Sequence, residues 1–131
     1  MQSGGWCYAY INDNKTWTAA GATCKALGGY LVEPYTQQEN DYLEKIMFEH
    51  SPVDIWMGGH DAITEGKWFW ATSGRAVSEA FTFWGPGQPN NYHNNQDCMQ
   101  FQYRSKHWND EECWKKLPFV CQKPIENTVV G

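Results

Sequence analysis

The first thirty residues change from strand-like aromatic spacing to helical spacing. Trp6–Ile11 is a short aromatic segment of the kind that forms a strand. Thr16 can cap a helix that we expect to extend to about Leu27, because apolar side chains then recur at intervals of three and four residues. This apolar stripe consists of Trp17, Ala20, Cys24 and Leu27. Gly28–Gly29 follows directly and predicts the end of the helix.

A second helix is predicted where a capping pair precedes another apolar stripe. Thr36 and Glu39 have the spacing of a capping box, which satisfies the first backbone amides of a helix. We expect this helix to extend to about Glu49, before Pro52 stops it. The side chains expected to face the core are Tyr42, Leu43, Ile46 and Met47.

After Pro52 the helical spacing gives way to short segments that predict strands. One of them, Cys98–Tyr103, alternates between apolar and polar positions, which predicts a half-buried strand. A stretch from Gly74 to Gln96 lies between the strands, and it is long enough to have a function of its own. The predicted strands are Ile55–Met57, Lys67–Trp70, Cys98–Tyr103, a partner beginning at His107, and Pro118–Cys121.

Two early helices followed by short antiparallel strands and one long loop predict the α+β class. The 131 residues have the length of one domain, and they contain neither an internal repeat nor a linker. Aromatic residues make up 16% of the chain, so we expect a core that is rich in aromatic side chains rather than in Leu and Ile. Residues 1–131 are therefore predicted to form a single α+β domain.

The charge and hydropathy of the chain exclude two classes of partner. The formal net charge is -5, whereas nucleic acids and anionic membranes bind basic surfaces. No apolar run approaches the roughly 18 residues that a membrane-spanning helix needs. We therefore expect neither a nucleic-acid partner nor a membrane span.

Five cysteines in so short a chain indicate an oxidising compartment and a disulfide framework. Asn14–Thr16 is a glycosylation sequon, which agrees with secretion. Five cysteines allow two bridges and one cysteine left over, in about 15 arrangements among which the sequence alone does not choose. The protein is predicted to be secreted and extracellular.

Residues 85–98, GPGQPNNYHNNQDC, combine glycine and proline with a run of amides. The segment offers many amide and backbone oxygens but only one carboxylate, that of Asp97. Three uses fit these groups: a metal ion, a sugar, or the segment's own backbone, which Asn commonly satisfies in turns. Composition alone leaves the three alternatives open.

Short motifs occur in a characteristic order between Cys7 and Cys121. They are Trp17 with Cys24, Leu31–Val32, Glu39–Asn40, IWMGGHD (55–61), EGKWFWATSG (65–74), QPN (88–90), DC (97–98), WND (108–110), Cys113 and PFVC (118–121). With these motifs the chain resembles a C-type lectin-like domain, of the kind found in soluble invertebrate lectins, over nearly its full length. The combination of QPN and WND is the most specific part of this resemblance. It implies the C-type lectin-like fold: two helices, short antiparallel sheets and a long loop, stabilised by disulfides.

The resemblance also implies two disulfides, Cys24–Cys121 and Cys98–Cys113. The first would tie the first helix to the last strand, and the second would anchor the long loop near WND. Each is expected to contribute about 2–4 kcal/mol to stability. Cys7 is left over, either as a buried thiol outside any bridge or as a bridge between two chains. We favour the interchain bridge, and with it a homodimer.

In sugar-binding members of this family a Ca²⁺ ion lies between the long loop and the WND strand, and its ligands also bind two sugar hydroxyls. The positions of this chain that match those ligands, should calcium bind, are Gln88, Asn90, Gln96, Asn109 and Asp110. The same residues are the candidate carbohydrate contacts. Tyr92 is expected to pack against the sugar ring, and His93 to add a polar contact.

The chain departs from the calcium-binding pattern at Gln88 and Gln96, where mannose-type relatives have Glu. Asp110 is then the only carboxylate among the five matched positions. Because calcium affinity depends on the number of charged ligands, we expect calcium binding to be weak or absent and no cofactor to be required. Amide side chains both donate and accept hydrogen bonds, so they suit direct binding of sugar hydroxyls without a metal.

The predicted function is that of a lectin for glycans on microbial or cell surfaces, with a role in innate immune recognition. Asn90 slightly favours mannose-type sugars, whereas Gln88 is typical of galactose-type relatives. Two sites in a dimer would raise the weak affinity of one shallow site through effective concentration. The alternative is a lectin-like domain that binds protein or mineral and no sugar.

Other kinds of chemistry find little support in the sequence. The acidic residues lack a companion nucleophile or base in a recognisable arrangement, so the chain is not expected to be an enzyme. The four histidines have neither an i, i+4 pairing nor cysteine neighbours, and they are expected in turns or at the surface rather than in a zinc site. They are His50, His60, His93 and His107.

Overall fold

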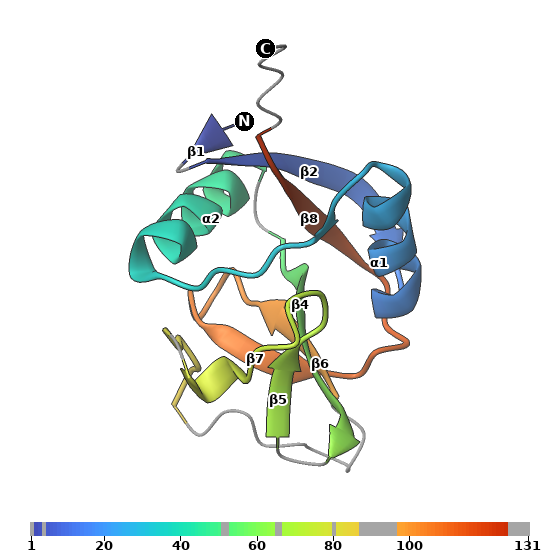
Figure 1. Ribbon diagram of the computed structural model, residues 1–131, viewed down its shortest axis with the longest axis vertical. Helices are drawn as coiled ribbons and strands as arrows, with labels where there is room; N and C mark the ends of the chain where they lie inside the picture. Colours follow the sequence, from blue (N-terminus) through green and yellow to red (C-terminus); the bar gives the residue numbers. More distant parts are fainter. Residues whose placement is uncertain are drawn as a thin grey trace, which may run out of the picture.

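The computed structural model describes residues 2–3, 5–50, 53–64, 67–79, 81–86 and 97–125 (Figure 1). Its elements are β1 (Gln2–Ser3), β2 (Trp6–Lys15), α1 (Trp17–Ala26), β3 (Tyr30–Leu31), α2 (Gln37–His50), β4 (Ile55–Thr64), β5 (Lys67–Trp70), the 3-10 helix η1 (Val77–Glu79), β6 (Cys98–Phe101), β7 (Trp108–Glu111) and β8 (Leu117–Pro124). The expected combination of two helices with short strands is confirmed. Strands β2, β4 and β8 are longer than predicted, because pairing with distant strands extends them beyond the local aromatic signal.

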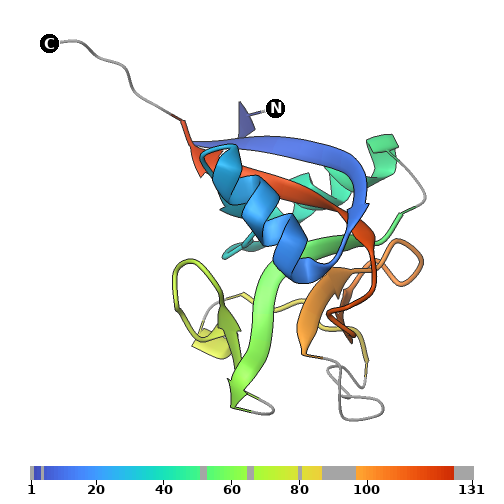
Figure 2. The same cartoon turned by 90° about the vertical axis from the view of Figure 1, so that its right-hand side faces the viewer.

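The strands of the described residues form one eight-stranded sheet in the order β1-β2-β8-β4-β6-β7, with β3 paired to β8 and β5 paired to β4. All of these pairs are antiparallel except β4 with β8, which are parallel where Trp56 meets Phe119. The first long strand and the last strand are therefore neighbours. Helices α1 and α2 lie on opposite sides of the β2–β8 pair (Figures 1 and 2).

Helix α1 begins and ends as its sequence predicts. The hydroxyl of Thr16 accepts a hydrogen bond from the amide of Ala19 at 3.3 Å, which caps the first turn. Gly28 adopts a φ of 85°, the left-handed conformation that ends many helices. Cys24 is fully buried, but Leu27 is 53% exposed, so the last residue of the predicted stripe does not reach the core.

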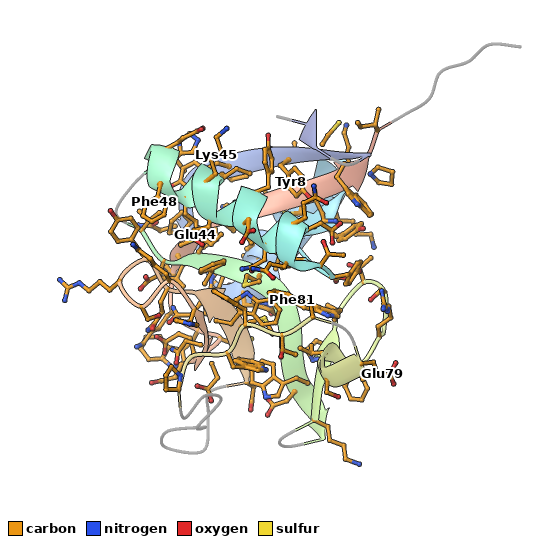
Figure 3. All side chains as sticks on the ribbon, turned by 90° about the vertical axis from the view of Figure 1, so that its left-hand side faces the viewer. Tyr8, Glu44, Lys45, Phe48, Glu79 and Phe81 are labelled. Carbon is orange, nitrogen blue, oxygen red and sulfur yellow. A yellow bond between two sulfur atoms is a disulfide. The ribbon has the colours of Figure 1, made fainter. Side chains whose placement is uncertain are left out.

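Helix α2 also begins at its predicted cap, with one difference. The hydroxyl of Thr36 accepts a hydrogen bond from the amide of Glu39 at 3.1 Å. The Glu39 carboxylate accepts from the amide of Tyr35 at 2.8 Å, one residue before the amide that a capping box would use. The helix buries Leu43, Ile46 and Met47 and turns Glu44, Lys45 and Phe48 away from them (Figure 3).

Strand β6 is fully buried rather than half-buried, which corrects the expectation from its alternating pattern. Met99 and Phe101 pack in the apolar cluster beneath α2, whereas Cys98 packs in the cluster beneath α1. Gln100 is the polar residue of the pattern, and it is 1% exposed because β7 covers it. Both faces of this strand are therefore covered, and it ends at Phe101 instead of Tyr103.

The core is aromatic, as the composition predicted. The indoles of Trp56, Trp70 and Trp108 are all fully buried. Trp70 and Trp108 meet edge to face with their ring centroids 5.5 Å apart, an arrangement that adds to the energy of burial. The largest fully buried side chains are therefore aromatic rings, and aliphatic side chains such as Leu43 and Ile46 pack around them.

Both disulfides that the resemblance implied are present. Cys24 and Cys121 connect α1 to β8, and Cys98 and Cys113 connect the start of β6 to the chain after β7. Cys7 belongs to neither bridge and is half-buried on β2, where it pairs with Lys123 of β8. The cysteine framework therefore fastens α1 to the last strand and closes the open end of the β6–β7 hairpin.

A buried carboxylate holds the turn that follows β5. Glu33 is fully buried and accepts hydrogen bonds from the amides of Thr72 at 2.8 Å and Ser73 at 3.4 Å, and from the hydroxyl of Tyr35. Gly58 lies against it, since a Cβ there would come within 2.9 Å of the Glu33 side chain. Burial raises the pKa of Glu33 above its ordinary value.

Candidate functional site

Strand β7 carries the two candidate site residues that the structure describes. Trp108–Glu111 pairs with β6 in a hairpin, so that Asn109 lies opposite Gln100 and Asp110 opposite Met99. Alternation along the strand turns Asn109 to the opposite face from its two neighbours. The sequence WND therefore places an amide and a carboxylate next to each other on one rigid strand.

The amide of Asn109 has a fixed orientation. Its nitrogen donates to the side-chain oxygen of Gln100 at 2.9 Å and to the backbone carbonyl of Asp110 at 2.8 Å. Because a backbone carbonyl can only accept a hydrogen bond, the side-chain atom of Asn109 that faces the Asp110 carbonyl must be the nitrogen. The oxygen, Oδ1, is then the atom on the other side of the amide group. Within the described part of the chain no donor reaches Asn109 Oδ1, and the residue is 8% exposed. This side chain therefore offers an acceptor oxygen.

Asp110 is fully buried beside it. A carboxylate without exposed surface is held by its surroundings, so truncating it would disturb the hairpin as well as any site. Asp110→Ala is therefore expected to destabilise the fold as well as any site. Asp110→Asn, which keeps the shape of the side chain, is the appropriate substitution.

The other candidate residues lie outside the described residues. These are Gln88, Asn90, Tyr92, His93 and Gln96. The chain on either side of them is described, and both flanks lie at the β6–β7 hairpin. Gly85 donates its amide to the carbonyl of Trp108 at 3.0 Å, and Cys98 pairs with Glu111. Gly85 and Cys98, which lie on the two sides of this segment in the sequence, are thus both next to the β6–β7 hairpin that carries Asn109 and Asp110.

Gln100 contacts a candidate site residue, and the sequence did not indicate this contact. Its side-chain oxygen accepts a hydrogen bond from the Asn109 amide nitrogen and so fixes the orientation of that amide. The available signal was a single glutamine in the apolar run Cys98–Phe101, where a buried amide needs a partner on the neighbouring strand. Identifying that partner requires the register of the hairpin, which the sequence does not contain.

The number of carboxylates among the five matched positions decides how strongly they can bind a calcium ion. Ca²⁺ takes six to eight oxygens, and carboxylates among them raise its affinity. The matched positions supply one carboxylate, from Asp110, and four neutral amides, so the set fits a calcium ion poorly. Among the described residues no group of three or more His, Cys, Asp or Glu side chains is arranged to hold a metal.

The three described histidines make ring contacts. His50 stacks on Tyr10 with the centroids 4.2 Å apart, and His107 stacks on Phe83 at 4.7 Å. His60 lies in β4 rather than in a turn, where it contacts Trp17, and burial lowers its pKa. His93 lies outside the described residues.

Comparison with known proteins identifies the family. The family model for the Lectin C-type domain matches residues 13–123. The chain belongs to the C-type lectin domain family. Its membership confirms the resemblance that the motifs carry, while the soluble invertebrate type stays a prediction. Because C-type lectin domains are non-enzymatic carbohydrate-binding domains, the expectation that this C-type lectin domain is not an enzyme is also confirmed.

Individual relatives agree with this assignment. A perlucin-like protein of Mytilus galloprovincialis is 34% identical over 119 residues, which cover 88% of this chain and 74% of that protein. The carbohydrate-recognition domain of mouse scavenger receptor C-type lectin superposes with a TM-score of 0.88 at 25% identity, covering 96% of this chain and 95% of that one. A calcium-independent type II antifreeze protein superposes with a TM-score of 0.82 at 27% identity, with coverages of 95% and 90%.

The extent of these matches limits what they say about whole proteins. This C-type lectin domain spans about a fifth to a little over half of the length of the first curated relatives that it matches.

The described residues include no helix that is both long and apolar enough to cross a membrane. The predicted C-type lectin-like fold is confirmed by structural neighbours with TM-scores of 0.82 to 0.88.

Proposed function

We propose that residues 1–131 form one secreted carbohydrate-recognition domain that binds sugar hydroxyls directly, with weak or no dependence on calcium. The observation that carries this proposal is the orientation of Asn109, whose amide nitrogen is used inside the β6–β7 hairpin while its oxygen has no donor among the described residues. A hydroxyl of a sugar is a donor of the required kind. Asp110, the next residue on β7, is fully buried and adds a negative charge close to this acceptor.

The weak calcium dependence follows from the charges of the proposed ligands. Gln88 and Gln96 are neutral where a calcium cage has carboxylates, so a cation would lose most of its electrostatic attraction. The same amides can approach one another without repulsion, and no cation is needed to hold them together. The structural similarity to a calcium-independent antifreeze protein supports the view that this fold does not require calcium dependence.

The sugar class is proposed from the QPN sequence. Asn90 favours sugars with the hydroxyl arrangement of mannose, glucose or N-acetylglucosamine, and Gln88 is the feature that would favour galactose. Tyr92 would contribute its apolar ring face and His93 a polar contact. Glycans on microbial or cell surfaces present such sugars at high density, and innate immune recognition is the role we assign.

A binding experiment with and without chelator tests the proposal. The protein is applied to mannose, N-acetylglucosamine and galactose resins in calcium and then in excess chelator. Retention on the mannose or N-acetylglucosamine resin is expected to persist in chelator, since the proposed binding through amides requires no metal. Affinities from calorimetry should differ by less than about threefold between the two buffers, which is under ~0.7 kcal/mol.

Asp110→Asn is the matched control for this experiment. It keeps the shape of the buried side chain but removes the negative charge next to Asn109, so sugar affinity should fall by about threefold to tenfold through the weaker electrostatic attraction at the site. Complete loss of binding of the unaltered protein in chelator would contradict the charge argument. Passage through all three resins without retention would contradict sugar binding altogether.

We also propose that the protein is a homodimer linked through Cys7. Cys7 and Leu27 both line a hollow of about 240 Å³, and Leu27 is 53% exposed. A second copy of the chain could cover this apolar surface. Electrophoresis without reductant should therefore show a species of double mass that disappears with reductant and in Cys7→Ser. A monomer under all conditions would refute the interchain bridge, and a dimer that persists in Cys7→Ser would place the link elsewhere.

The second candidate function is binding of protein or mineral without sugar. It is favoured by the similarity to an antifreeze protein, since that protein has this fold and a name that refers to ice rather than to sugar. The resin experiment separates the two candidates, because a protein of this kind would elute unretained.

A further inference from the structure

We infer that an aromatic hollow beside the candidate sugar site is a second subsite, which stacks the next sugar unit of an oligosaccharide. The hollow has a volume of about 350 Å³ and is lined from three segments: β5, η1 and the residue that precedes Gly85. Its lining includes Lys67, Trp68, Phe69, Val77, Ser78 and Trp84. This inference rests on the proposed function, because it extends the bound ligand from one sugar to several.

Two indole rings form a corner in this hollow. Trp68 and Trp84 meet edge to face, with centroids 5.1 Å apart and planes at 66°. Trp68 is 8% exposed, while Trp84 and Phe69 are half-buried, so the rings are anchored in the core and still present a surface. Trp84 also packs against Trp108 at 6.0 Å. Rigid aromatic faces of this kind bind flat, partly apolar ligands with little loss of side-chain entropy.

The corner is continuous with the candidate site. Trp84 forms a β-bridge with Trp108, and Trp108 is the neighbour of Asn109 on β7. The next residue, Gly85, donates its amide to the Trp108 carbonyl at 3.0 Å, and the chain then leads into the segment that contains Gln88 and Asn90. Because Asn109 and Trp108 point to opposite faces of β7, a ligand that contacts both Asn109 and the hollow must pass over the edge of β7, where Trp84 forms its bridge.

The rim of the hollow favours a sugar over a hydrocarbon chain. Lys67 and Ser78 are both exposed, and they place an ammonium and a hydroxyl beside the rings. A pyranose has an apolar face of C–H groups and a polar edge of hydroxyls, so it can stack on an indole and hydrogen-bond to the rim at once. A purely apolar ligand would desolvate the ammonium and the hydroxyl without replacing their hydrogen bonds.

The position of η1 provides a blocking variant and its control. Ser78 lines the hollow, whereas its exposed neighbour Glu79 does not line it, and Figure 3 shows Glu79 at the periphery of the molecule, directed outward. Ser78→Trp would fill the hollow without removing any core side chain. Glu79→Trp adds the same indole to the same short helix outside the hollow.

Calorimetry with two ligand pairs tests the subsite: methyl α-mannoside with mannotriose, and N-acetylglucosamine with chitotriose. For the pair that binds, Ser78→Trp should weaken trisaccharide binding about tenfold, the contribution of roughly one stacked ring, and leave monosaccharide binding unchanged. Glu79→Trp should match the unaltered protein with both ligands. Lys67→Ala, at an exposed position, should give a smaller loss confined to the trisaccharide.

The outcomes separate the subsite from the proposed function. Equal trisaccharide affinity in Ser78→Trp and the unaltered protein would overturn the subsite while leaving sugar binding intact. An equal loss for monosaccharide and trisaccharide would also overturn it, since the substitution would then act on the first site. Absence of binding to all four ligands by the unaltered protein would overturn the proposed function and the subsite with it.

Discussion

Removing the Cys24–Cys121 bridge by a double substitution to alanine is expected to lower the free energy of unfolding by about 4–5 kcal/mol, above the about 2–4 kcal/mol typical of a disulfide, because the loop that it closes is long. The bridge joins residues 97 positions apart, so its loss frees almost the whole chain in the unfolded state. Both sulfur atoms also lie in the core, where Cys24 is fully buried and Cys121 is 5% exposed. Since domains of this size are stable by about 5–15 kcal/mol, the variant should be close to unfolding at room temperature.

Urea denaturation at low temperature, followed by tryptophan fluorescence, measures this loss. The matched control is the double alanine variant of Cys98 and Cys113, which opens a loop of only 15 positions and should lose about 3 kcal/mol. The difference between the two variants is the decisive quantity. A larger loss from the short bridge than from the long one would contradict the loop-closure explanation, and would indicate that the β6–β7 hairpin is held mainly by its disulfide.

The local part of the fold could be predicted from the sequence because its causes are local. Thr16 caps α1 and Gly28 ends it, and both effects depend on residues within one turn of the helix. The order of cysteines and of the QPN and WND motifs then implied both disulfides, which local patterns alone left among many arrangements. Short-range signals and family motifs therefore supplied the elements and their connections.

The burial of individual polar residues could not be predicted in the same way. Gln100 occupies a polar position of an alternating strand, yet it is buried, because β7 covers it and Asn109 satisfies its oxygen. Asp110 matches a family position that binds ligands, and its full burial became apparent only from the packing of the hairpin. These properties depend on strand register, which brings together residues that the sequence separates.

Glu33 is the clearest example of such a missed residue, and it leads to the second large expected effect. Nothing in LVEPYT, residues 31–36, distinguishes it from a surface glutamate, but its carboxylate is fully buried and receives the backbone amides of Thr72 and Ser73. Glu33→Ala would leave these donors and the Tyr35 hydroxyl without their acceptor. We expect the free energy of unfolding to fall by about 3 kcal/mol or more, since each buried donor left unsatisfied costs about 1–3 kcal/mol.

Glu33→Gln is the matched variant, and pH reveals the charge separately from the hydrogen bonds. Burial raises the pKa of Glu33 above 4.5, so the folded protein holds this proton more tightly than the unfolded chain. The stability gained from that proton is fully present below about pH 4.5 and is lost as pH rises through the raised pKa. The test measures the free energy of unfolding of the unaltered protein and of Glu33→Gln at intervals from about pH 3 to about pH 8. The two free energies should diverge as pH rises. The unaltered protein is expected to lose stability relative to Glu33→Gln as pH rises, and then to run parallel to it.

A difference that is constant over the whole range, or one that grows in favour of the unaltered protein, would mean that the amides of Thr72 and Ser73 stabilise the charge more than burial opposes it.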